Sequence, residues 1–375
     1  MSGVPDPTKK EQVSQSYWSL VWWKFKKNKL AILGGIILIL FYATCGLFAE
    51  FVSPYRLDYQ TDYLKARPQR IVFKDTEGNF SLRPAVYGLD QEVDLETRQR
   101  TWTVNEEVIY PLSFLVKGQE YKLLGFIPAK VHLFGVNTEK YPEGVVFLFG
   151  TDSLGRDLFS RIFYGGRLSL LIGLLGQALT LILGSVMGAI SGYYGGVTDI
   201  LVQRLTEFVG AFPDIPLFMA LAAAIPVYWS PILVYFMLTL IMVFLRWGGL
   251  ARQVRSLILS LREREYVLAA QSAGASDRRL MLRHLLPGTM SHVIVIATLM
   301  IPGMILSETA LSWLGLGLRP PLTSWGVLLQ EVSSVRMIRF SPWLLIPVPF
   351  IIVAVLAFNM LGDGLRDALD PYGGR

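Results

Sequence analysis

Long apolar segments separated by polar stretches dominate the chain. Six segments have the composition of membrane-crossing helices, which need about 20 predominantly apolar residues. They cover residues 30–52, 168–191, 200–229, 231–245, 293–311 and 343–361. This pattern predicts an all-α polytopic membrane protein with about six transmembrane helices. The third and fourth segments are the least sharply separated, because only a short WSP turn at 229–231 divides them.

Prolines interrupt two of these segments. The third contains FPDIP at 212–216, so Pro213 and Pro216 predict a kinked or broken helix around Asp214. The fifth contains Pro302 and Gly303. These positions are candidates for flexible points. The alternative is that they are kinks which the helices simply tolerate.

A polar region at 53–150 separates the first two apolar segments. Within it, RIVFKDTEGNFSL at 70–82 predicts two strands around an EGN turn. YKLLGF at 121–126 and VVFLF at 145–149 are candidates for further strands. We therefore expect a small, β-rich insert between the first span and the remaining spans.

Composition and charge support a membrane protein and give it an orientation. The chain is 52% hydrophobic and 17% charged, whereas ordinary soluble domains are about 25% charged. The net charge is +6, with lysines clustered at 9–29 and arginines at 246–283. Such clusters lie on the cytoplasmic side of membranes. Both termini and a loop at 246–290 are thus predicted to be cytoplasmic, and the 53–150 insert is predicted to be extracytoplasmic. The sequence contains no nucleic-acid-binding motif that would explain the positive charge otherwise.

The N-terminal residues 1–29 are predicted to hold an interfacial helix. The segment WSLVWWKFKKNK places aromatic and basic residues together, as helices at a membrane surface do. The apolar run that follows is longer than the core of a cleavable signal peptide. It is therefore interpreted as the first transmembrane helix.

Few residues have the arrangement of a catalytic or metal site. Cys45 is the only cysteine, and His132, His284 and His292 are too scattered to predict a metal site. Glu308 is a carboxylate at membrane depth, which is energetically costly and often functional. It could line a path, or pair with Arg319 or Arg336, or lie at the interface satisfied by water or backbone.

Several charged residues suggest local ionic contacts. The three-residue spacing of Arg204 and Glu207 predicts a helical ion pair, and Asp363 and Arg366 allow the same interpretation. A further cluster is expected to fix the chain as it enters the second span, with a direct substrate contact as the alternative, and it comprises Asp152, Arg156 and Asp157.

The stretch YVLAAQSAGASDRRLMLRHLLPG at 266–288 predicts a compact pair of helices between two spans. Residues 254–273 lack glycine and proline, and Gly274 is a typical helix stop. Ser276 and Asp277 can cap a second helix that ends before Pro287. The small alanines at 269 and 270 would allow another surface to approach closely. Arg278, Arg279 and Arg283 could bind that surface or lipid phosphates.

The spacing from Ala269-Ala270 through Gly274 to Leu286-Pro287 resembles the EAA loop of ABC importer permeases. Leu268 replaces the leading glutamate of that pattern. GTDSLGRDLFSRIFYGGRLSL at 150–170, LSETALSWLGLGLRPPLTSWG at 306–326 and NMLGDGLRDALDP at 359–371 resemble the dipeptide and oligopeptide branch. The resemblance covers about 1–52 and 150–375 and is closest to the second, C-type permease of such systems.

The resemblance implies that the loop docks on an ATPase subunit. The residues it assigns to this coupling are Ala269, Ala270, Gly274, Ala275, Ser276, Asp277, Arg279, His284, Leu286 and Pro287. Candidates for the translocation path or its gating are Pro213, Asp214, Pro302, Gly303 and Glu308. The 53–150 insert could dock or cover a solute-binding protein, or merely stiffen the outer face.

The implied function is that of a transport subunit in a bacterial inner membrane. Its implied partners are a sister permease, two ATP-binding subunits, a periplasmic or extracellular solute-binding protein and membrane lipid. The chain lacks G-x-x-x-x-G-K-[ST], so ATP and Mg are expected on the partner subunits, with no cofactor in this chain. Peptides or peptide-like solutes are expected, and oligosaccharides, sugar derivatives or nickel chelates are the alternatives. An intramembrane enzyme and a receptor are the competing classes.

Overall fold

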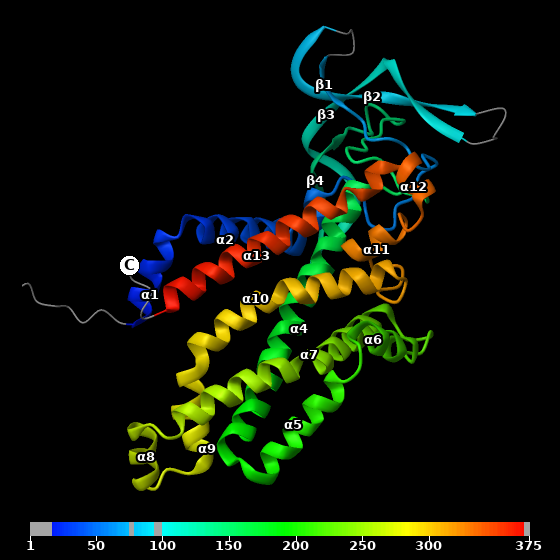
Figure 1. Cartoon of the computed structure of the whole chain (residues 1–375). Coiled ribbons are helices and arrows are strands. Elements are labelled where there is room, and N and C mark those ends of the chain that lie inside the picture. Colours follow the sequence, from blue (N-terminus) through cyan, green and yellow to red (C-terminus); the bar gives the residue numbers. More distant parts are fainter. Residues whose placement is uncertain (1–16, 75–78, 94–99, 371–375) are drawn as a thin grey trace, which may run out of the picture.

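The computed structural model describes residues 17–74, 79–93 and 100–370. Lys9, Lys10 and residues 371–375, which are predicted to be cytoplasmic, lie outside these ranges. Figure 1 shows a bundle of long helices with a small sheet at one end and the short helix α8 at the other. We call these the sheet end and the α8 end.

The segment that is predicted to be interfacial folds as helix α1 (Tyr17–Lys27). The first apolar segment follows as a helix that is interrupted near the sheet end, with the elements α2 (Lys29–Phe41), a π-helical stretch η1 (Tyr42–Leu47) and α3 (Ala49–Val52). Asn28 begins α2, because its side-chain oxygen accepts a hydrogen bond from the Ala31 amide at 3.1 Å. The candidate membrane span covers Lys29–Leu47.

The insert contains one four-stranded antiparallel sheet. Its strands, in spatial as in sequence order, are β1 (Ile71–Lys74), β2 (Phe80–Val93), β3 (Arg100–Leu123) and β4 (Ile127–Val136). The two strands predicted within 70–82 are therefore confirmed, and YKLLGF supplies the end of β3 and the turn after it. The side of the membrane on which the sheet lies stays a prediction.

The strand predicted for VVFLF is wrong. Phe147 pairs instead with one residue of another loop: its carbonyl accepts from the Gln69 amide at 2.9 Å, and its amide donates to Gln69 Oε1 at 2.6 Å. The Phe147 ring is fully buried beside Tyr55 and Tyr63. The apolar run therefore fills space beneath the sheet as a loop.

The helices that follow the sheet build most of the bundle. They are α4 (Leu158–Tyr194), α5 (Gly196–Gly210), α6 (Asp214–Ala223), α7 (Pro231–Leu261), α10 (Leu286–Trp313) and α13 (Pro347–Leu369). Among the described residues, five helical segments could each cross a membrane, and six could do so if α5 and α6 form one bent span. These two helices meet at 86°, so the predicted break at FPDIP is confirmed.

Helix α7 is longer than its apolar segment. The sequence predicts an end near residue 245, but the helix continues to Leu261 and carries Arg246 and Arg255, which were expected in a loop. Both arginines find partners on neighbouring helices. Arg255, for example, forms an ion pair of 2.6 Å with Asp199 of α5. Because this pairing satisfies their charges, the arginines can lie within the helix, and α7 continues past the point where hydropathy falls.

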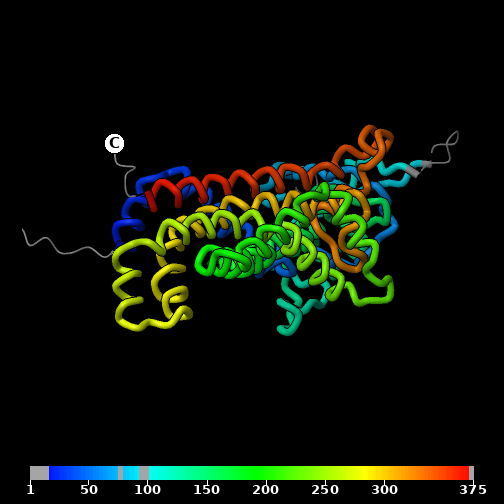
Figure 2. The backbone as a smooth tube through the Cα atoms, turned by 60° about the horizontal axis from the view of Figure 1, so that its bottom comes forward, coloured from blue at the N-terminus to red at the C-terminus, as the bar shows by residue number. Residues whose placement is uncertain are grey.

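Helix α4 runs along α7, and α2 lies beside α13 (Figures 1 and 2). Glycines allow close contact between α4 and α7: a Cβ atom at Gly188 would lie 2.5 Å from the Ala251 carbonyl oxygen. Short helices close the sheet end, namely α11 (Trp325–Gln330), α12 (Val335–Phe340) and the 3-10 turn η3 (Pro342–Leu345).

Candidate functional site: the α8 knob and a polar pocket

The predicted pair of helices forms a compact knob at the α8 end. The knob spans residues 265–285 and contains α8 (Glu265–Ser272), α9 (Asp277–Arg279) and the π-helical stretch η2 (Leu280–Leu285). Figure 2 shows it, in yellow, at the end of the bundle opposite the sheet, where it projects to one side of the long helices.

Gly274 ends α8 in the way its position predicts. Its φ is +81°, a left-handed conformation that favours glycine. The Gly274 amide donates to the Gln271 carbonyl at 2.9 Å, and the Ala275 amide donates to the Ala270 carbonyl at 3.1 Å. These two bonds are the Schellman pattern of a helix C-terminus. A Cβ atom at Gly274 would have no neighbour within 4 Å, so only the backbone conformation selects glycine.

Two predicted boundaries of the knob are wrong. The helix expected over 254–273 is interrupted, because α7 ends at Leu261 and α8 begins at Glu265. The turn between them allows Val267 to join a buried cluster with Ile258 and Leu280. That long-range contact overrides the good local helix propensity.

The second helix was expected to end before Pro287 but continues through it into α10. The π-helical stretch lies just before Pro287. A proline in a helix removes an amide donor and crowds the carbonyl four residues earlier. A π-helical turn relieves this conflict by shifting the hydrogen-bond register.

Burial separates the two faces of the knob. Val267, Leu280 and Leu285 are buried against α4, α7 and α10. Tyr266, Leu268 and Leu282 are large apolar side chains on the exposed face. The other predicted coupling residues divide between exposed (Ala269, Gly274, Ser276, Asp277, Arg279, Pro287) and half-buried (Ala270, Ala275, His284, Leu286).

The start of the second helix differs in detail from the prediction. Ser276 occupies the N-cap position, but its side chain makes no capping hydrogen bond. Asp277 accepts a hydrogen bond from the Tyr193 hydroxyl at 2.7 Å. Tyr193 lies at the end of α4, so this bond adds a polar contact to the apolar packing of the knob on that helix. No local pattern indicates this pairing, because 84 residues separate the two side chains.

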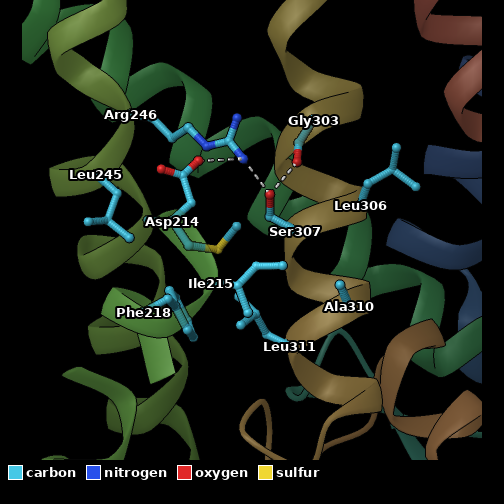
Figure 3. A pocket seen from close by; sticks show the side chains of 11 residues that line it. Asp214, Ile215, Phe218, Leu245, Arg246, Gly303, Leu306, Ser307, Ala310 and Leu311 are labelled. Carbon is cyan, nitrogen blue, oxygen red and sulfur yellow. Dashed lines mark hydrogen bonds and ion pairs between the residues drawn. The ribbon is translucent and has the colours of Figure 1, made fainter. Parts of the chain in front are cut away.

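A polar pocket lies between α6, α7 and α10, with a volume of about 410 Å³. Its polar side chains are Asp214, Arg246 and Ser307, surrounded by apolar ones (Figure 3). Arg246 donates a hydrogen bond of 2.7 Å to Ser307 Oγ, which itself donates to the Gly303 carbonyl at 2.8 Å. Arg246 also faces Asp214 across 3.8 Å.

This pocket contains two of the predicted path residues, Asp214 and Gly303. Sequence reasoning missed Arg246 and Ser307. An arginine in the middle of a membrane helix is costly and is normally retained for a function. Its signal was hidden because Arg246 begins a run of arginines that resembled a cytoplasmic loop.

The predicted flexible points behave differently from one another. Pro213 stands at the sharp break before α6 and has an extended backbone conformation. Pro302 is buried inside α10, which continues through it as one helix. Only the first of the two prolines therefore accompanies a change of chain direction.

Glu308 is enclosed by hydroxyl groups. Its carboxylate accepts hydrogen bonds from Ser312 Oγ at 2.7 Å and Ser169 Oγ at 3.2 Å. Ser169 Oγ also accepts a bond from the Trp325 amide at 3.1 Å. No ion pair in the described part of the chain joins Glu308 to Arg319 or Arg336, so that predicted pairing is wrong. The network links α4, α10 and α11, and a role of Glu308 in the path stays a prediction.

A charged cluster holds the chain where α4 begins. Asp152 accepts from the Leu154 and Arg156 amides and forms ion pairs with Arg156, at 2.7 Å, and with Arg161. Glu331 of the segment after α11 joins both arginines, a partner that the sequence did not indicate. The prediction that this cluster fixes the chain entering the second span is confirmed.

Asp157 caps α4. Its Oδ2 accepts hydrogen bonds from the Ser160 amide at 2.8 Å and the Ser160 hydroxyl at 2.6 Å. Burial raises the pKa of the Asp157 carboxyl to about 7, and the nearby Asp152 adds to that rise, although the bonds from Ser160 oppose it. The helical ion pair predicted for Arg204 and Glu207 is also present, at 2.7 Å.

Comparison with known proteins agrees with these features. Residues 184–372 match the family described as binding-protein-dependent transport system inner membrane component. Residues 16–69 match the N-terminal TM domain of oligopeptide transport permease C. The sheet lies between these two matches.

Several curated relatives are similar over most of their length. The oligopeptide transport system permease protein OppC of Haemophilus influenzae is 43% identical over 230 residues, which are 61% of this chain and 71% of the relative. OppC of Bacillus subtilis is 39% identical over 237 residues, or 63% of this chain and 75% of the relative. The dipeptide transport system permease protein DppC of Alkalihalophilus pseudofirmus is 42% identical over 224 residues, or 60% and 71%.

The apolar helices and these matches together define a multi-pass inner-membrane transport protein. The chain belongs to the family of ABC importer permeases, in the C-type branch of oligopeptide and dipeptide permeases. It is a transport subunit and not an enzyme, because ATP hydrolysis in this family belongs to separate ATPase subunits.

Proposed function

We propose that this permease forms, together with a sister permease, the translocation path of an importer for peptides or peptide-like solutes. The relatives named for oligopeptide and dipeptide transport support this solute class. The observation that carries the proposal is the polar pocket. It offers a cation, Arg246, and an anion, Asp214, in one apolar space between helices. Charges of both signs suit a zwitterionic peptide, whose two ends are oppositely charged.

In this proposal the α8 end faces the cytoplasm and the sheet end faces outward. Residues 1–29 and the 246–290 region would then lie inside, and the 53–150 insert would lie outside. The first span would be formed by residues 30–52, and the permease domain by residues 151–375. The lysines in the last turn of α1 and the exposed arginines of the knob favour this orientation. ATP and Mg would be bound by two partner subunits, and a solute-binding protein would deliver the solute.

The knob is proposed to couple the ATPases to the pocket. Its exposed face, with Tyr266, Leu268 and Ala269, offers an apolar contact for an ATPase groove. Its buried face packs on α7 and α10, and these two helices also line the pocket. A movement of the knob would therefore reach the pocket through two continuous helices. Coupling of this kind requires two discrete arrangements of the bundle.

Each remaining candidate for the translocation path has a different proposed role in this movement. The break at Pro213 lets α6 change its angle to α5, which would reposition Asp214. Gly303 lies beside the Arg246 guanidinium, where a Cβ atom would make an ordinary contact of 3.8 Å with an arginine nitrogen, so it is proposed as a flexible point of α10. Pro302 and Glu308 lie within α10 and are proposed to set the position of that helix against α4.

Transport by a reconstituted complex tests the solute class. Proteoliposomes would hold this chain, its sister permease and both ATPases, with the binding protein added outside. We expect ATP-dependent uptake of radiolabelled di- and oligopeptides. Uptake of an oligosaccharide or a nickel chelate in place of peptides would contradict the proposed solute class. Uptake without ATP would contradict the importer mechanism.

Crosslinking tests the docking of the knob separately. Ala269 is exposed and Ala270 is half-buried, so the pair is a matched probe of which face docks. In a Cys45→Ser background, Ala269→Cys is expected to crosslink to a cysteine in the ATPase groove, and Ala270→Cys is expected to react much less. Equal reaction at both positions, or none at Ala269, would contradict docking through the exposed face of α8.

A further inference from the structure

The turn between β3 and β4 is apolar where such turns are normally polar. Leu124 and Gly125 have φ values of +53° and +86°, and the Gly125 amide donates to the Lys122 carbonyl at 3.0 Å. Asn-Gly is the favoured pair for two successive residues with positive φ, because leucine is strained there. Leu124, Phe126 and Ile127 are nevertheless 42%, 70% and 45% exposed. The chain thus places Leu124 at an unfavourable backbone position and leaves it and its two apolar neighbours largely exposed.

The hairpin runs toward the membrane-spanning helices as it approaches this turn. His132 lies on β4 away from the turn, and its Nδ1 atom is 2.6 Å from the carbonyl oxygen of Ser53, a residue just after the first span. Two residues nearer the turn, Lys130 lines a hollow of about 540 Å³ together with Glu50 of α3 and Tyr164 in the second turn of α4. Glu50 precedes Ser53, so it lies closer to the span.

The turn also projects beyond the bundle. Figure 2 shows the β3–β4 hairpin, in teal, extending sideways from the long helices, while the β1–β2 end of the sheet extends along them. The turn therefore stands beside helices that are long and apolar enough to cross a membrane.

Lysines lie along both strands that lead to this apolar turn. Lys117, Lys122 and Lys130 are exposed, and Glu120 is the only acid between residues 117 and 130. Glu120 pairs with Lys130 at 2.5 Å, and this contact holds the pKa of Glu120 below its usual range. Three lysines and one glutamate leave a net charge of +2 over this stretch. The positive charge next to the turn is thus complementary to anionic phosphates.

We propose that the β3–β4 turn is a phospholipid-binding site that inserts into the headgroup layer of the leaflet at the sheet end. Leu124, Phe126 and Ile127 reach the boundary of the acyl chains, and Lys117 and Lys122 bind lipid phosphates. Apolar side chains next to cations are the features by which peripheral elements lie in a membrane interface. The site thereby fixes the height of the insert above the membrane, a role that does not depend on the identity of the solute.

Photocrosslinking in the whole transporter tests this site. The complex would carry Phe126→benzoylphenylalanine and be placed in nanodiscs of phosphatidylcholine, alone or mixed with phosphatidylglycerol. Mass spectrometry is expected to find lipid adducts at position 126, in higher yield with phosphatidylglycerol. Leu82→benzoylphenylalanine is the matched control, because Leu82 is 85% exposed on β2 and lies away from this turn.

Two further variants separate lipid binding from folding. Leu124→Asn creates the favoured Asn-Gly turn, so it keeps the hairpin and the thermal stability of the complex but lowers the lipid adduct yield. Lys122→Glu is expected to lower the yield about fivefold in the anionic nanodiscs. An adduct with the sister permease or the binding protein, an absence of adducts, or equal lipid yields at positions 126 and 82 would each overturn the proposal.

Discussion

The Tyr193 hydroxyl donates a hydrogen bond to Asp277 across 2.7 Å, and this bond joins the end of α4 to the start of α9 in the knob. The knob already continues into α10 through the chain and packs on α7 through Val267. The bond therefore adds a polar contact to the apolar packing of the knob on α4, a third helix that would move with it. Because α4 also packs along α7, it would transmit the motion across the bundle.

Tyr193→Phe is expected to weaken coupling without preventing assembly. The substitution removes one hydrogen bond at an exposed position, which is worth about 1 kcal/mol. It keeps the aromatic ring that packs near the knob. In proteoliposomes we expect fewer solute molecules imported per ATP hydrolysed, while the amount of purified complex stays the same.

Tyr194→Phe is the matched control for this change. Tyr194 neighbours Tyr193 and is 52% exposed, and no hydrogen bond of its hydroxyl is found among the described residues. It should leave the ratio of import to hydrolysis unchanged. Equal effects of the two substitutions would show that the Tyr193–Asp277 bond has no special part in coupling.

Gly274→Ala is expected to destabilise the knob through the backbone alone. Its φ of +81° costs a residue with a side chain about 1 kcal/mol, although nothing lies near the added methyl group. Amide hydrogen exchange of residues 270–280 should become about fivefold faster. Gly249→Ala is the control, because a Cβ atom there also meets no neighbour but the glycine is helical. That change should stabilise α7 by about 0.5–1 kcal/mol, and faster exchange in both variants would refute the conformational explanation.

The sequence predicted those parts of the fold that local chemistry determines. Apolar length predicts the spans, the FPDIP prolines predict the break before α6, and Gly274 predicts the end of α8. Each of these features depends on residues that are neighbours in the chain.

Features that depend on distant residues were missed. The end of α7 was misplaced because Arg255 pairs with Asp199, a partner 56 residues away. VVFLF was assigned to a strand because apolar loops that fill a core have the same composition as buried strands. Arg246 lies in a run of arginines that predicts a loop, and its partners Ser307 and Asp214 are distant from it in the sequence. In each case the decisive contact is tertiary.

Arg246→Gln is expected to impair transport much more than stability. The ion pair with Asp214 is long and partly exposed, so its loss should change the free energy of unfolding by less than about 1 kcal/mol. Glutamine can still bond to Ser307 but offers no charge to a peptide carboxylate. Because a charged hydrogen bond is worth about 1.5–3 kcal/mol, peptide uptake should fall at least about tenfold.

Arg204→Gln removes a comparable charge outside the pocket and is the control for Arg246→Gln. Arg204 is exposed and pairs with Glu207 on the same helix. Uptake by this variant should match that of the unaltered complex. If Arg246→Gln transports peptides at the normal rate, the pocket is not part of the path.

Glu308→Ala is expected to destabilise the permease because it leaves the hydroxyls of Ser169 and Ser312 without their shared acceptor. Burying such unsatisfied groups costs about 1–3 kcal/mol. Thermal unfolding of the purified complex should therefore begin at a lower temperature. Glu308→Gln keeps an oxygen acceptor and the side-chain shape and should lose less. A larger loss for glutamine than for alanine would contradict this hydrogen-bond account.

Asp157 is expected to make the stability of the permease depend on pH. The folded protein retains the Asp157 proton up to about pH 7, whereas the carboxyl ordinarily releases it near 3.8. Between these values the unfolded chain binds fewer protons than the folded protein, so stability falls as pH rises. The contribution of this group is complete below pH 3.8 and lost as pH rises through 7. It amounts to at most roughly 4 kcal/mol.

Asp157→Asn tests this dependence because asparagine is an equally good helix cap and does not titrate. Unfolding temperatures measured from pH 4 to pH 8 should decline less steeply in this variant than in the unaltered complex. At pH 8 the variant should be the more stable of the two, since it buries no charge. Asp58→Asn, which changes an exposed carboxylate paired with Arg56, should leave the slope unchanged. An identical slope in all three proteins would mean that Asp157 is ionised in the folded state, held by its two bonds from Ser160.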